Sequence, residues 1–129
     1  MPSSASRGRI LVIDDDPDIR DALVDTLEDE GYEVVQKSGG QEALTYLRSN
    51  PAPALILLDW NMAPMNATQF MEEFCKEPAM SAIPVVLLTA DVHASQKALT
   101  SRYDAFVTKP VHLDTLFATI ERSLGARKA

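Results

Sequence analysis

The chain has 129 residues, of which 46% are hydrophobic, so its length fits one domain with one core. Its 12 basic and 19 acidic residues give a net charge of -7, which works against binding nucleic acid or an anionic membrane. The single cysteine, Cys75, rules out an internal disulfide, and no stretch is apolar for long enough to form a signal peptide or membrane span, so we expect a cytoplasmic location.

Short apolar runs alternate with segments of helical spacing along the chain. The apolar runs predict five β-strands, at residues 10–13, 34–35, 55–58, 85–88 and 105–107. The first helix is predicted from both of its ends, with Asp16 as N-cap, Pro17 as its first residue and Gly31 just past its end. Further helices are expected at residues 40–49, 67–77, 92–102 and 113–124. We expect residues 1–8 to form a disordered tail, residues 9–125 one domain, and residues 126–129 a frayed C-terminal tail.

This alternation predicts an α/β fold of the (βα)5 type. Strands that are apolar on both faces and are separated by helices form a parallel sheet covered on both sides. Ligands of such sheets bind at the carboxyl ends of the strands. Four of the predicted strands end in polar side chains, namely Asp14 to Asp16, Asp59, Thr89 and Lys109. We therefore expect these side chains to share one edge of the sheet.

The aspartates at this edge predict a site for a hard divalent cation. Asp15 and Asp59 would supply carboxylate oxygens and a backbone carbonyl after Asp59 a third ligand, while Asp14 would orient Asp15. Two carboxylates about 5 Å apart repel each other by roughly 3 kcal/mol at an effective dielectric of about 20, and Mg²⁺ would turn that repulsion into attraction. From residues 9–20 alone, a solvated acidic turn that caps the first helix is an equally good interpretation.

Lys109 and Thr89 favour phosphoryl chemistry at the same edge. Taken singly, Lys109 is a charge at a strand end and Thr89 a local cap. Together with Mg²⁺ they would hold the oxygens of a transferring phosphoryl group, where catalysis is mostly positioning and charge stabilisation. Asp59 would then be the nucleophile and would form an acyl phosphate.

Four segments resemble the receiver (response-regulator) domain of two-component signalling, in particular its single-domain chemotaxis-type members. They are VIDD at 12–15, LLDWNM at 57–62, LTA at 88–90 and FVTKP at 106–110, and the resemblance covers roughly residues 9–125. It implies a flavodoxin-like three-layer sandwich with strand order 2-1-3-4-5. It also implies that Asp59 accepts a phosphoryl group from a phosphohistidine on a sensor histidine kinase or histidine phosphotransfer protein.

The resemblance assigns roles to further residues. It implies that Asp14, Asp15, Asp59 and the backbone carbonyl of Asn61 bind Mg²⁺, that Thr89 and Lys109 hold the phosphoryl group, and that the Lys109–Pro110 bond is cis. Phe106 stands at the position of the family's aromatic switch, which swings inward when Thr89 moves, although core packing explains a phenylalanine there equally well. We also expect Asn61 and Asp91 to tune the lifetime of the phosphoryl group, because both would flank an attacking water.

The loop after the third strand departs from the family pattern. Pro64 is displaced by one position, and Ala67 replaces a glycine; before the last strand, Arg102 and Tyr103 replace the usual Gly-Ala. If the position of Ala67 requires a positive φ, alanine costs about 1 to 2 kcal/mol there. We expect these changes to affect the choice of partner more than the chemistry.

Other interpretations remain open at this point. A small phosphohydrolase with Asp14 as nucleophile fits poorly, because Asp18 stands where that family has Thr or Val and no room remains for its cap domain. One alternative is a receiver-like adaptor that works without phosphate. Another is the excised receiver of a hybrid kinase or of a DNA-binding regulator. We favour a signalling protein that is not an enzyme for other substrates but catalyses its own phosphorylation and dephosphorylation. Its output would be a contact with a downstream protein, made by the face of the 92–102 helix, the last strand and the last helix.

Overall fold

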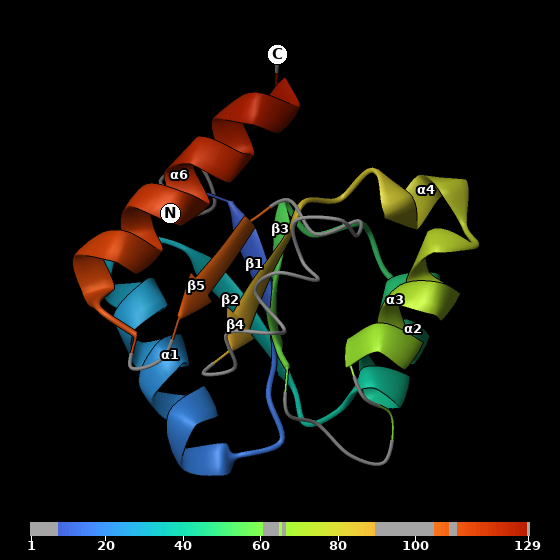
Figure 1. Ribbon diagram of the computed structural model, residues 1–129, viewed down its shortest axis with the longest axis horizontal. Helices are drawn as coiled ribbons and strands as arrows, with labels where there is room; N and C mark the ends of the chain where they lie inside the picture. The colour runs from blue at the N-terminus through green and yellow to red at the C-terminus, as the bar shows by residue number, and fades with distance from the viewer. Residues whose placement is uncertain (1–7, 61–64, 66, 90–104, 109–110, 129) are drawn as a thin grey trace.

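The computed structural model describes residues 8–60, 65, 67–89, 105–108 and 111–128, and its centre is a five-stranded parallel sheet (Figure 1). The strands lie in the order β2-β1-β3-β4-β5. Each of the five predicted strands is confirmed and is at most two residues longer at either end than predicted. Their bounds are β1 (Arg9–Ile13), β2 (Glu33–Lys37), β3 (Leu55–Asp59), β4 (Val85–Thr89) and β5 (Ala105–Thr108).

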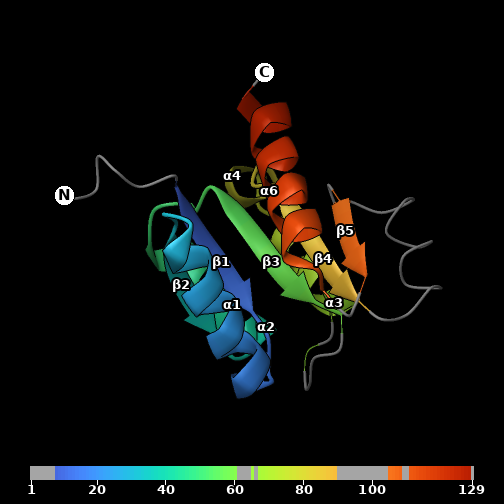
Figure 2. The ribbon, with the colours of Figure 1, turned by 90° about the vertical axis from the view of Figure 1, so that its left-hand side faces the viewer.

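Helices cover both faces of the sheet, which makes the predicted three-layer sandwich. Figures 1 and 2 show α1 (Pro17–Asp29) and α6 (Leu113–Lys128) on one face, and Figure 1 shows α2 (Gly40–Ser49), α3 (Ala67–Cys75) and the short α4 (Pro78–Ser81) on the other. The fold is therefore the flavodoxin-like α/β arrangement expected from the sequence. The predicted helix at 92–102 lies outside the described residues.

Two helices differ in length from the prediction. The expected helix at 67–77 ends at Cys75, and Pro78 begins the separate turn α4. Proline lacks an N–H and disfavours helical backbone in the residue before it, which explains the break. At the other end of the chain, α6 continues to Lys128, so residues 126–128, which we expected to form a frayed tail, are helical.

The end of α1 is fixed by a turn around Gly31, as its sequence predicts. Gly31 has a φ of 96°, a conformation that glycine adopts without strain. Its N–H donates to the carbonyl of Glu28 (3.0 Å), and the N–H of Tyr32 donates to the carbonyl of Leu27 (3.1 Å). Tyr32 and Leu27 are buried in the same cluster beneath the helix. These hydrogen bonds and this contact end the helix, and the chain then runs back along the sheet.

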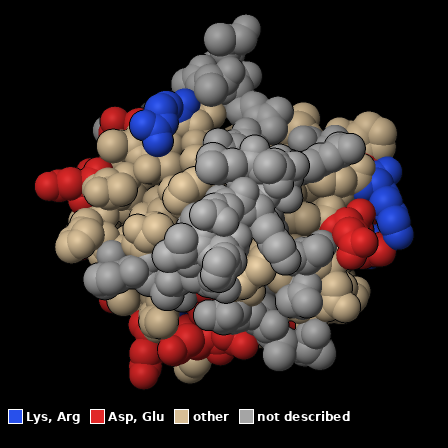
Figure 3. Space-filling view, viewed as in Figure 1, with Lys and Arg blue, Asp and Glu red and all other residues tan. Residues whose placement is uncertain are grey.

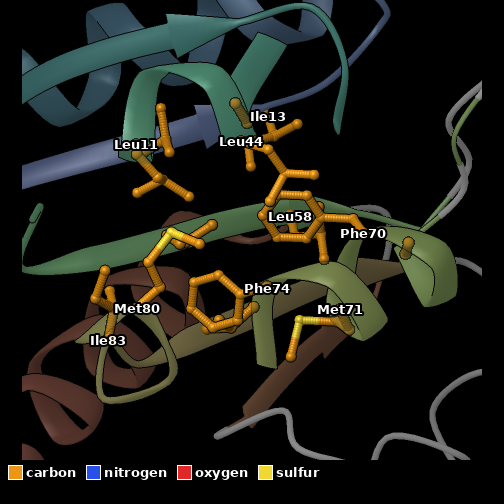
Figure 4. Close-up of a cluster of buried hydrophobic side chains, with 14 of the residues drawn as sticks. Leu11, Ile13, Leu44, Leu58, Phe70, Met71, Phe74, Met80 and Ile83 are labelled. Atoms are coloured by element: carbon orange, nitrogen blue, oxygen red, sulfur yellow. The ribbon is translucent and has the colours of Figure 1, made fainter. Parts of the chain in front are cut away.

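The core lies on both faces of the sheet. Leu58 packs with Phe70 and Phe74 beneath α2 and α3, and the two phenylalanine rings stack with their centroids 5.6 Å apart (Figure 4). Leu57, which points to the other face, packs with Ile120 and the rest of the cluster beneath α1 and α6. Each fully buried side chain of this kind stabilises the fold by about 1.5 to 3 kcal/mol. The central strands are thus held firmly up to the residues at their carboxyl ends.

Ala67 packs into this core without the strain that a left-handed alanine would cause. It begins α3 and is fully buried. Helical residues have a negative φ, so the cost that we expected if this position needed a positive φ does not arise. Nearby, a Cβ added to Gly40 would lie 2.8 Å from Sδ of Met65, which shows how closely the start of α2 approaches this segment. The rest of the loop before Ala67 lies outside the described residues.

Candidate functional site

Three aspartates meet at the carboxyl edge of the sheet. Asp14 directly follows β1 and Asp59 ends β3, and these strands are parallel neighbours. One carboxylate oxygen from each of Asp14, Asp15 and Asp59 lies within 4.8 Å of the others. Asp14 and Asp59 are almost completely buried, with exposures of 1% and 3%, whereas Asp15 is exposed. The predicted meeting of side chains from separate strands is therefore present in the described part of the chain.

Local hydrogen bonds give the three consecutive aspartates different roles. Oδ1 of Asp16 accepts from the N–H groups of Asp18 (3.0 Å) and Ile19 (3.4 Å), so Asp16 is the N-cap of α1, as predicted. Oδ1 of Asp14 accepts instead from the N–H of Asp16 (2.9 Å), and its side chain lies in the cluster. An N-capping acidic turn therefore accounts for Asp16 but leaves the meeting of Asp14 and Asp15 with Asp59 unexplained.

Among the described residues, several acidic side chains lie on the surface beside the cluster. Asp15, Asp16 and Asp18 are all exposed where β1 passes into α1. Figure 3 shows acidic side chains gathered along the lower edge of the molecule, where this corner lies in the view of Figure 1. Carboxylate oxygens within 5 Å of one another repel by roughly 3 kcal/mol per pair at an effective dielectric of about 20. A hard cation with oxygen ligands fits such a donor set, and Mg²⁺ needs few protein ligands because it keeps several waters.

Thr89 and Phe106 lie on the strands next to this cluster. Thr89 ends β4 and is fully buried. Asp59 pairs with Leu88 in register, so Thr89 stands one position further along the same edge. Phe106 pairs with Leu87 and packs, partly buried, against the core beneath α2 and α3. The fold therefore places the predicted hydroxyl at the carboxyl edge and the predicted aromatic on the adjoining strand.

Trp60 links the end of β3 to β4. It directly follows Asp59, and its N–H donates to the carbonyl of Leu88 (2.9 Å). Its side chain is partly buried against the core cluster beneath α2 and α3. Because it is the only tryptophan in the chain, its fluorescence reports on the neighbourhood of Asp59 alone.

Three predicted site residues lie outside the described residues, so the structure does not place them. They are Asn61, Asp91 and Lys109, and the predicted cis bond to Pro110 lies outside as well. One contact was missed by reasoning from the sequence: Nη1 of Arg20 donates to the backbone carbonyl of Asp14 (2.8 Å). The only local signal for it is that Arg20 lies one helical turn after the N-cap Asp16, on the side where α1 meets the end of β1.

Comparison with known proteins agrees with this geometry. Residues 10–121 match the response regulator receiver domain family. The chain is 32% identical to Protein PilH of Pseudomonas aeruginosa over 119 residues, covering 91% of this chain and 98% of PilH. It is 34% identical to the phosphate regulon transcriptional regulatory protein PhoB of Escherichia coli over 115 residues, covering 88% of this chain but only 50% of PhoB.

A solved structure of a receiver domain has the same fold. The signal receiver domain of a signal transduction histidine kinase from Syntrophus aciditrophicus superposes with a TM-score of 0.83 at 30% identity, covering 92% of this chain and 91% of that one. Within the described part of the chain, no helix combines the length and apolarity that crossing a membrane requires. The family match spans most of the chain, and the solved structure agrees with the observed fold. The chain belongs to the response regulator receiver domain family.

Proposed function

We propose that this receiver domain is the phosphoacceptor of a two-component phosphorelay and that Asp59 takes a phosphoryl group from a phosphohistidine on a partner protein. The observation that carries the proposal is the meeting of Asp14, Asp15 and Asp59, whose carboxylate oxygens lie within 4.8 Å of one another at the ends of two strands. Gathering like charges in this way costs free energy and calls for a ligand that offsets it. The partner would be a sensor histidine kinase or a histidine phosphotransfer protein.

The residues at this edge fit Mg²⁺. Asp14, Asp15 and Asp59 would hold the ion, together with the backbone carbonyl of Asn61. When bound, Mg²⁺ supplies positive charge that offsets the three carboxylates and draws an anionic phosphoryl group to them. Asp59 is the member of the cluster that ends the fully buried strand β3, so its position is fixed by the core rather than by a loop.

The chemistry proposed for the chain's own residues is a phosphoryl transfer. A carboxylate oxygen of Asp59 attacks the phosphorus of the phosphohistidine, the new P–O bond forms as the P–N bond breaks, and the imidazole leaves with the electron pair. Lys109 and the Thr89 hydroxyl hold the phosphoryl oxygens. Water later attacks the phosphorus of the acyl phosphate, the P–O bond to Asp59 breaks, and inorganic phosphate leaves as the carboxylate is regenerated. Asn61 and Asp91 orient that water and so set the lifetime. The chain thus catalyses its own phosphorylation and dephosphorylation.

The output proposed for the domain is a changed protein contact. Thr89 can reach a phosphoryl group only by moving toward Asp59, and Phe106 on the adjoining strand fills the space that Thr89 leaves. This would alter the face of the predicted 92–102 helix, β5 and α6, where a downstream protein would bind. The net charge of -7 favours a protein partner over nucleic acid, and we expect the domain to act in the cytoplasm.

Two alternative functions are consistent with the same family. Because the chain matches half of PhoB, its sequence also suits the receiver part of a longer transcriptional regulator. Its match to the receiver domain of a histidine kinase suits a hybrid kinase. A receiver-like adaptor that never accepts phosphate is the other alternative. It predicts that the aspartate cluster takes up no phosphoryl group, which distinguishes it directly from our proposal.

The proposal is tested by incubating the chain with Mg²⁺ and acetyl phosphate and measuring its intact mass. We expect the mass of one phosphoryl group to be added, and to be absent when a chelator replaces Mg²⁺. Asp59→Asn keeps the size of the side chain and should abolish the addition. Asp18→Asn is the matched control, because it removes an exposed acidic side chain of α1 and should label like the wild type. Undiminished labelling of Asp59→Asn would refute the assignment of the acceptor, and a wild type that takes no phosphate would favour the adaptor.

A further inference from the structure

Both peptide groups that flank Asp15 are held by hydrogen bonds. The peptide between Asp14 and Asp15 is held through its carbonyl, which accepts from Nη1 of Arg20 (2.8 Å) in a partly buried position. The peptide between Asp15 and Asp16 is held through its N–H, which donates to Oδ1 of Asp14 (2.9 Å). The backbone on either side of the exposed member of the cluster is thereby fixed.

Arg20 is itself anchored to the sheet. Its Nε donates to Oε1 of Gln36 (3.0 Å) on β2, the strand that pairs with β1. The N–H of Asp14 also donates to the carbonyl of Lys37 on that strand (3.2 Å). A guanidinium is planar and donates in two directions at once, so Arg20 can hold the loop carbonyl while its other edge is fixed by Gln36. The arrangement connects α1, β2 and the turn that carries Asp15.

We propose that Arg20 is a positioning residue for the cation site, acting on Asp15 through the peptide that precedes it. This inference rests on the proposed function, because it concerns how the aspartates bind Mg²⁺. Asp15 is exposed, so the packing that fixes buried Asp14 and Asp59 is not available to it, and the direction of its carboxylate depends on its backbone. Hydrogen-bond partners that orient a metal ligand commonly change metal affinity by about 10- to 100-fold when they are removed.

The test is a Mg²⁺ titration of Arg20→Gln in which Trp60 fluorescence monitors binding. We expect the dissociation constant to rise by about 10-fold, the low end of the usual range for such partners. Arg20→Lys should recover part of the affinity, because an ammonium can hold the Asp14 carbonyl but lacks the second edge that Gln36 fixes. Arg9→Gln is the matched control, since Arg9 also bonds across to β2 through its Nε but at the opposite end of β1. It should bind Mg²⁺ like the wild type.

A second measurement tests the positioning role of Arg20 in the absence of metal. In the metal-free protein, Arg20→Gln should speed hydrogen exchange at the Asp16 amide, which is held by the turn, while the amides in the middle of β1 keep their protection. If Arg20→Gln does not fold, Gln36→Ala removes the anchor at an exposed position and should weaken Mg²⁺ binding in the same direction.

The possible outcomes separate this inference from the proposed function. A folded Arg20→Gln with wild-type Mg²⁺ affinity would overturn the role of Arg20 and leave the proposed site standing. Equal weakening by Arg9→Gln would also overturn it, because the effect would then follow from any lost arginine. A wild type whose fluorescence ignores Mg²⁺ would contradict the proposed site and, with it, this inference. An additional loss from Gln36→Ala in the Arg20→Gln background would show that Gln36 does not act through Arg20 and would contradict the proposed anchor.

Discussion

The amino and carboxyl ends of the sheet carry their charges in opposite arrangements. At the amino end, Arg9 of β1 and Glu33 of β2 pair in register, with Nε and Oε2 3.0 Å apart. At the carboxyl end, Asp14, Asp15 and Asp59 bring three like charges together. Opposite charges across neighbouring strands stabilise a sheet slightly, whereas like charges destabilise it. The arrangement at the amino end is therefore the one that stability alone favours, whereas the arrangement at the carboxyl end is the one that the proposed cation would offset.

The largest effect is expected from weakening the core at the amino end of the sheet. Leu55→Ala, at the amino end of β3 and fully buried, should cost about 2 to 5 kcal/mol, because it removes apolar contacts and leaves a cavity. Urea unfolding measures the loss. The stabilisation that Mg²⁺ gives should survive in this variant, since Asp59 lies at the other end of the strand. Loss of the Mg²⁺ effect would show that the two ends are not independent.

A smaller effect is expected from the cation itself. Mg²⁺ at ten times its dissociation constant should stabilise the folded chain by about 1.4 kcal/mol if it binds only the folded state. Unfolding in Mg²⁺ and in chelator gives the difference. Asp15→Ala should lose most of this stabilisation, and Arg9→Gln, at the opposite end of the sheet, should keep all of it. Equal losses in both variants would mean that Mg²⁺ acts as a general salt.

Removing one of the like charges should stabilise the metal-free protein. Before screening, the repulsion on Asp15 is roughly 3 kcal/mol per neighbour at an effective dielectric of about 20. Because this side chain is exposed, solvent and salt reduce the gain from Asp15→Asn to about 1 kcal/mol. Asp18→Asn gives the contrast, because an acidic group in the first turn of α1 is favourable and its loss should cost about 0.3 to 1 kcal/mol. Urea unfolding in chelator tests both. The same sign for the two variants would contradict the repulsion.

The smallest effect is expected at the amino end. The Arg9 and Glu33 side chains are 32% and 52% exposed, so Arg9→Gln should cost only about 0.5 kcal/mol. The cost should disappear in high salt, because salt screens exposed pairs. Unfolding at low and high ionic strength checks this. A larger, salt-independent loss would mean that Arg9 contributes through packing of its side-chain stem.

The elements whose signals are local can be predicted from the sequence alone. All five strands stand where the apolar runs predicted them, and both ends of α1 are fixed by neighbouring residues, Asp16 at the start and Gly31 at the end. The sequence also predicts that Asp14, Asp15 and Asp59 meet, because the carboxyl ends of parallel strands share one edge. Such predictions need only the period of a segment, the chemistry of a turn or the direction of a strand.

Features that depend on how the elements pack became evident only in the folded structure. Asp14 and Asp15 are adjacent in the chain, yet the first is buried against the sheet and the second faces solvent. Ala67 is accommodated because it is buried in the core cluster that contains the apolar side chains of α2 and α3. Arg20 reaches the carbonyl of Asp14 because α1 lies back across β1. These contacts join atoms whose separation is set by the position and rotation of whole helices. The pattern of residues along one helix does not specify that placement, because it arises from the close packing of many side chains at once.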